Sequence, residues 1–125
     1  MTPLIFIMLS IAGGVGAVVR FIVDGFVRAH MTTRFAWATT IINVSGSLVL
    51  GFLTGLTVEH LVSTDTSYVL GTGFLGGYTT FSTASYETVQ LIKERRYGQS
   101  FISGVVMLVL ALAAAGLGLW IGTSI

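Results

Sequence analysis

The chain has 125 residues, of which 54% are hydrophobic and only 9% are charged. A soluble domain carries about 25% charged residues, so this composition and a mean hydropathy of +0.92 predict a membrane protein with one domain, residues 1–125. The net charge of +1 gives no reason to expect nucleic acid, and the absence of cysteine excludes disulfides, thiolate catalysis and cysteine metal sites.

Four apolar segments follow one another along the chain, separated by short polar connections. Each contains about 20 residues or more, the length that a helix needs to cross about 30 Å of hydrocarbon. Small residues recur at four-residue spacing within two of them, which allows helix backbones to approach closely in lipid. The sequence therefore predicts an all-α membrane protein with four transmembrane helices. The segments are 3–23, 35–58, 68–92 and 100–122, and the small residues are Ser47, Gly51 and Gly55, with Gly118 and Gly122.

The third segment is a poor continuous helix. Four glycines lie between Gly71 and Gly77, and a Tyr-Thr-Thr-Phe-Ser-Thr run follows them. Each glycine costs about 1 kcal/mol in a helix relative to alanine, and Ser and Thr offer the backbone competing hydrogen bonds. We therefore expect this helix to break near the middle of the membrane. Such a break must be buried by protein or must line a wet cavity.

Basic residues are distributed unequally among the connections. The second connection, 59–67, has no Lys or Arg, and neither terminus carries a basic side chain. The first and third connections together contain five basic residues. By the positive-inside rule, these two face the cytoplasm, and both termini lie outside the plasma membrane of a bacterial cell in a fixed orientation. The five are Arg28, Arg34, Lys93, Arg95 and Arg96, accompanied by Asp24, His30 and Glu94.

Two ionisable side chains, Arg20 and Glu87, and the amide of Asn43 stand within or at the edge of the spans. Intramembrane charges are costly and mark candidate functional sites. Arg20 either serves such a site or extends its guanidinium to the headgroups, and Glu87 either serves it or pairs with a basic group. Asn43 needs hydrogen-bond partners or water, and we favour a place on a transport pathway over a simple link between helices.

No set of residues in the sequence resembles a catalytic centre. There is no nucleophile with a matching base and acid, and the two histidines lie far apart without metal-ligand spacing. The protein is therefore not expected to be an enzyme.

The run Gly73-Phe-Leu-Gly-Gly-Tyr-Thr-Thr-Phe-Ser-Thr-Ala-Ser-Tyr-Glu-Thr88 resembles the small fluoride channels of the Fluc/CrcB family. Gly14-Val-Gly-Ala-Val-Val-Arg20 and Asn43-Val-Ser-Gly-Ser47 support the resemblance, which covers essentially the whole chain. It implies a fluoride-selective channel that lets fluoride leave the cytoplasm passively and so confers fluoride resistance.

The resemblance also implies an architecture and a set of site residues. Two four-helix subunits would pack antiparallel as a dimer, with two fluoride pathways along their interface. A structural Na⁺ at the dimer centre would be held by the backbone carbonyls of Gly76 and Thr79, since carbonyls at broken helices suit such an ion. The pathway positions map to Arg20, Asn43, Phe81, Ser82, Thr83 and Glu87.

Two positions depart from the family pattern. A second pore phenylalanine of the family falls on Ala84, and 106–115 in the fourth segment has no hydroxyl where relatives often carry several. A hydrated anion needs groups that replace its water, so we expect a homodimer to conduct poorly. Together with five basic residues against none, this favours a heterodimer with a homologous subunit of opposite topology, a homodimer being the alternative.

Two other functions compete with a conducting subunit. One is a non-conducting scaffold that orients a conducting partner, which Ala84 favours. The other is a proton-coupled small multidrug transporter, whose mechanism needs a carboxylate in the first span. No Asp or Glu precedes Asp24 here, so we disfavour the transporter.

Overall fold

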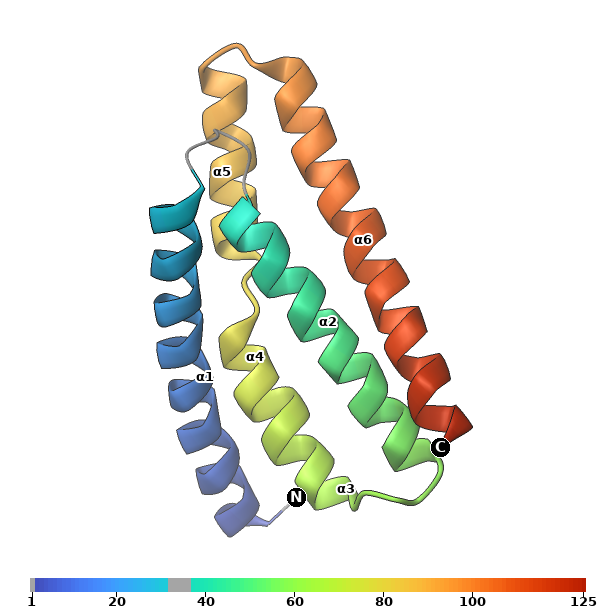
Figure 1. The fold of residues 1–125 in the computed structure, drawn as a ribbon. Coiled ribbons are helices and arrows are strands. Elements are labelled where there is room, and N and C mark those ends of the chain that lie inside the picture. The colour runs from blue at the N-terminus through green and yellow to red at the C-terminus, as the bar shows by residue number, and fades with distance from the viewer. Residues whose placement is uncertain (1, 32–36) are drawn as a thin grey trace.

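The computed structural model describes residues 2–31 and 37–125, and these ranges contain helices and no strand (Figure 1). This confirms the predicted all-α fold. The elements are α1 (Pro3–His30), α2 (Trp37–Val58), α3 (Thr64–Ser67), the π-helix η1 (Tyr68–Leu75), α4 (Gly76–Tyr78), α5 (Ser82–Lys93) and α6 (Tyr97–Ser124).

Within the described ranges, three helices, α1, α2 and α6, are long and apolar enough to cross a membrane. The third spanning segment is composite: α3, η1 and α4 follow one another directly, and α5 resumes after the non-helical residues 79–81. The predicted break in the third helix is therefore confirmed, and it falls at the Thr-Thr-Phe sequence. Both termini lie at the same end of the bundle (Figure 1).

The first helix is longer than predicted. α1 continues to His30, so Asp24, Arg28 and His30 lie on the helix and not in a connection. The reason is local: the Arg28 guanidinium is 2.9 Å from the Asp24 carboxylate one turn earlier, and the positive charge suits the carbonyl end of a helix. Arg34, which was predicted to lie in the first connection, is outside the described residues.

The small residues bring helix backbones together, as predicted. α2 and α6 run in the same direction and cross closely (Figure 1), and a Cβ atom added to Gly55 would be 2.8 Å from the carbonyl oxygen of Leu119. Cβ atoms added to Gly51 or Gly118 would likewise collide with the backbone of the other helix. The contact therefore depends on residues without side chains.

The broken helix is held against α1 in the same way. A Cβ atom on Gly73 would be 2.7 Å from the carbonyl oxygen of Leu9, and one on Gly77 would collide with Gly13. Gly16 of α1 faces Phe74 so closely that a Cβ atom there would overlap its carbonyl group. This contact fixes the segment that leads into the break.

Gly16→Ala is expected to destabilise the protein, because a methyl group there must displace the backbone of η1. Overpacking of this kind costs about 1–3 kcal/mol. Gly14→Ala is the matched control, since a Cβ atom on Gly14 meets nothing within 4 Å. Thermal unfolding in detergent should show a lower midpoint for Gly16→Ala only. Equal midpoints for the two variants would contradict the close contact between α1 and η1.

Candidate functional site

The break in the third helix is held by the side chain of Asn43. The Asn43 Nδ2 group donates to the carbonyl oxygen of Thr80 at 2.8 Å, and the Thr80 N–H donates to Asn43 Oδ1 at 2.9 Å. The Asn43 side chain, on α2, therefore satisfies both the N–H and the carbonyl of Thr80, as the backbone of another residue would. Buried backbone groups need such partners in lipid.

This arrangement releases two carbonyl groups from their helical donors. In a continuous helix the Thr80 N–H would bond to Gly76 and the Thr83 N–H to Thr79, four residues back. Here the first donates to Asn43 Oδ1, and the second donates to the Thr80 hydroxyl at 3.2 Å. The carbonyls of Gly76 and Thr79 thus lose the donors that an unbroken helix would direct at them. They are the two carbonyls that the resemblance assigns to Na⁺.

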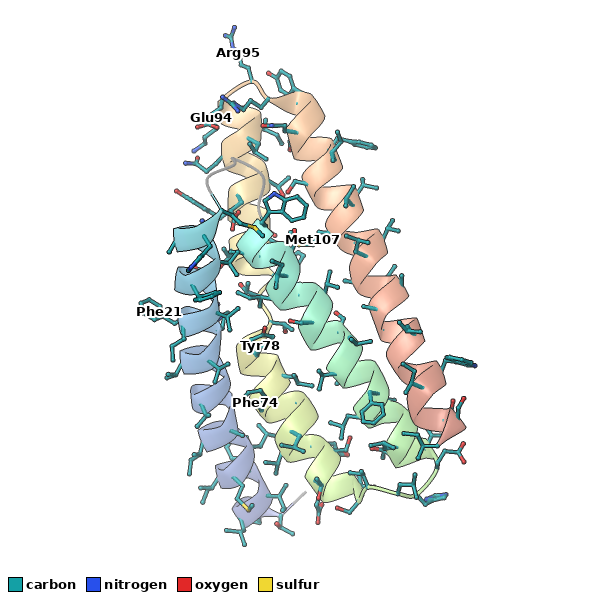
Figure 2. The ribbon with its side chains drawn as sticks, viewed as in Figure 1. Phe21, Phe74, Tyr78, Glu94, Arg95 and Met107 are labelled. Atoms are coloured by element: carbon teal, nitrogen blue, oxygen red, sulfur yellow. The ribbon has the colours of Figure 1, made fainter. Side chains whose placement is uncertain are left out.

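A groove of about 800 Å³ lies beside the break, between α2, the broken helix and α6. Phe81 lines it with 87% of its surface exposed, and Ala84 lines it on α5. The α6 side is apolar, with Gly104, Met107 and Leu108, and Met107 is drawn in Figure 2. The hydroxyl groups of the groove come from α2, η1, the break and α5. They belong to Ser47, Thr72, Thr79, Thr80, Ser85 and Thr88.

A second, smaller cavity lies on the α1 side of the break. It measures about 170 Å³ and has a mixed lining that includes the charged residues Arg20 and Asp24 of α1. Thr39 and Thr83 also line it, and Thr80 lines both this cavity and the groove. The break residue Thr80 therefore stands between two compartments.

The predicted pathway residues fall into three places. Asn43 and Phe81 line the groove, and Arg20 and Thr83 line the small cavity. Glu87 lines neither: its Oε1 atom accepts a short hydrogen bond from Thr39 and another at 3.3 Å from Arg28 Nη2. Ser82 begins α5, but its side chain lies outside the described ones.

Sequence reasoning missed three residues that shape this region. Thr80 is the backbone partner of Asn43 and also caps the start of α5 through its hydroxyl. The sequence contained a sign of this cap, because a Thr just before a helix commonly accepts a hydrogen bond from a backbone N–H in the first turn. Thr39 and Arg28, the partners of Glu87, lie 48 and 59 residues from it and left no local pattern.

These features define the class of the protein: a small helical membrane protein whose third span breaks beside an open groove. Comparison with known sequences gives the family. The family described as "CrcB-like protein, Camphor Resistance (CrcB)" matches residues 7–119, so the chain belongs to the CrcB family.

Curated relatives align along almost the entire chain. A protein of Leifsonia xyli named "Fluoride-specific ion channel FluC 1" is 52% identical, covering 98% of this chain and 89% of its own. "Fluoride-specific ion channel FluC 2" of Mycobacterium tuberculosis is 41% identical, covering 97% and 93%. "Fluoride-specific ion channel FluC 1" of Ligilactobacillus salivarius is 39% identical, covering 93% and 97%.

Asn43→Ala is expected to lower the free energy of unfolding by about 2 kcal/mol, since two hydrogen bonds of about 1 kcal/mol each are lost. The Thr80 amide should also exchange faster with solvent, as measured by NMR in detergent. Asn43→Asp is the matched control: its carboxylate still accepts from the Thr80 N–H, so that amide should stay protected. Fast exchange in both variants would contradict the pairing of the Thr80 N–H with Asn43 Oδ1.

Proposed function

We propose that this chain is a subunit of a fluoride-selective ion channel through which fluoride leaves the cytoplasm passively. The observation that carries the proposal is the open groove at the break, where Asn43, Phe81 and several hydroxyl groups converge. The names of the relatives support fluoride as the ion. HF that enters a cell dissociates there, and a passive channel drains the trapped anion.

The groove supplies donors that a dehydrated anion requires. An Asn side chain has two N–H donors. One bond runs from Asn43 Nδ2 to the Thr80 carbonyl, and the same nitrogen lies 3.4 Å from the Met107 sulfur. Sulfur is a weak acceptor, so an anion in the groove competes well for this N–H. The positive ring edge of Phe81 offers a further favourable contact.

The carbonyls of Gly76 and Thr79 fit the Na⁺ that the family resemblance implies. Both residues line the groove, and the N–H donors four residues on are directed elsewhere. Carbonyls at the end of a broken helix are suitable ligands for this cation. When bound, Na⁺ supplies a fixed positive charge at the centre of the dimer.

The partner is an antiparallel homologous subunit, and we favour a heterodimer. Phe81 and the groove lie on an open face, which a second subunit would cover. This chain contributes Ala84 and an apolar α6 wall to that face, so a homologous partner would supply the missing aromatic ring and hydroxyl groups. A homodimer remains the alternative.

A non-conducting scaffold subunit is the second candidate function. The observation that favours it is again the wall formed by Ala84 and α6, which offers an anion no hydrogen-bond donor. In that case the partner's residues alone would line the working pathway.

The protein is a membrane protein, with three apolar helices of spanning length in the described ranges. Its orientation in a bacterial plasma membrane follows from charge. Glu94 and Arg95 lie at the end of the bundle opposite to the termini (Figure 2), the end at which α1 places Arg28 and His30. The positive-inside rule directs this end to the cytoplasm and both termini outside.

Liposomes carrying the purified chain alone should release fluoride slowly, and liposomes in which it is paired with a homologue of opposite charge bias should release it rapidly while retaining chloride. A fluoride electrode records the rate. In the active pair, Phe81→Ala should slow efflux roughly five- to tenfold, the effect of losing about 1 kcal/mol of anion stabilisation. The matched control is Phe101→Ala, an exposed α6 phenylalanine that does not line the groove.

Three results would correct parts of this proposal. Rapid, chloride-excluding efflux from the chain alone would contradict the heterodimer. An unchanged rate for Phe81→Ala in the pair would favour the scaffold function. Absence of efflux from both preparations would contradict the channel function itself.

The fixed orientation can be tested because the chain contains no cysteine. In intact cells, a membrane-impermeant maleimide should label Ser124→Cys near the C-terminus but not Gln99→Cys at the start of α6. Both should be labelled once the cells are opened. Labelling of both variants in intact cells would show insertion in two orientations and contradict the charge argument.

A further inference from the structure

Arg28 lies between two carboxylates that belong to different helices. Its Nε atom is 2.9 Å from Asp24 Oδ1 on α1, and its Nη2 atom is 3.3 Å from Glu87 Oε1 on α5. Glu87 also accepts a hydrogen bond from Thr39 on α2. One guanidinium therefore ties together carboxylates that are 63 residues apart in the chain, since 87 − 24 = 63.

Four charged side chains take part in these ion pairs or line the small cavity beside them. They are Arg20, Asp24 and Arg28 on α1 and Glu87 on α5. The sequences of α2 and α6 contain no Asp, Glu, Lys or Arg. The four charged side chains sum to zero, and without Arg28 they would sum to −1.

The group also adjoins the small cavity at the break. Asp24 and Thr39 line that cavity together with Arg20. Asp24 is bound to Arg28, and Thr39 is bound to Glu87. The side chain of Glu87 is 19% exposed, so solvent screens its charge only in part.

We infer that Arg28 is a positioning residue, acting through Glu87 and Asp24 to keep their negative charges from repelling an anion at this end of the pathway. The inference rests on the proposed function. An acidic group beside a permeation path favours cations and opposes anions. Pairing with a guanidinium lets the carboxylates link α1, α2 and α5 without that effect. Arg28 need not touch fluoride to do this.

The test measures fluoride efflux from liposomes that contain the conducting assembly. Arg28→Gln should slow efflux about tenfold, because it leaves the Asp24 and Glu87 carboxylates without their guanidinium and so adds one net negative charge. The double variant Arg28→Gln/Glu87→Gln removes both charges and should recover most of the rate that Arg28→Gln loses. Lys93→Gln is the matched control: it removes an exposed basic residue from the last turn of α5 and should leave the rate unchanged.

The double variant separates electrostatics from structure. If Arg28 only held the helices together, removing Glu87 as well would not restore efflux, and a double variant as slow as Arg28→Gln would overturn the inference. If Arg28→Gln alone fails to elute as a folded assembly, the double variant still tests the inference. An unchanged rate for Arg28→Gln would overturn it too. A wild-type assembly without efflux would instead contradict the proposed function.

Discussion

The structure depends on the two hydrogen bonds that join the Asn43 side chain to the Thr80 backbone. A helix that breaks inside a membrane leaves peptide groups that lipid cannot satisfy. The Asn43 side chain pairs with both the N–H and the carbonyl of Thr80, and the Thr80 hydroxyl in turn accepts from the first turn of α5. One amide and one hydroxyl therefore supply the break with hydrogen bonds that lipid cannot offer.

The glycine contacts supply the rigidity that this break requires. Backbone contact with α1 at Gly16 and Gly77 fixes the segment before the break. The Arg28–Glu87 pair and the bond from Ser100 to the Thr88 carbonyl attach the segment after it to α1 and α6. α1 therefore holds both halves, and α6 also holds the second half.

The fold was largely predictable, whereas the site was predictable only in part. Span length and the glycine-rich run predicted the helices and the break, because both are local consequences of hydropathy and propensity. The extension of α1 to His30 was missed, since apolar length does not reveal that Asp24 and Arg28 continue a helix through an ion pair. Asn43 was predicted as a polar group in need of partners. Its actual partner, the Thr80 backbone, and the pairing of Glu87 depend on tertiary packing, which no local pattern encodes.

The open face has a consequence for how the protein matures in the cell. A lone subunit in the bilayer would expose Phe81 and the hydroxyl groups of Thr79 and Ser85 to acyl chains, which cannot hydrogen-bond with them. If the proposed second subunit covers this face, assembly completes folding, because the partner removes the face from lipid. In the proposed heterodimer, unpaired copies would keep this face in contact with lipid, so the balance between synthesis of the two subunits should determine how much of each survives cellular quality control.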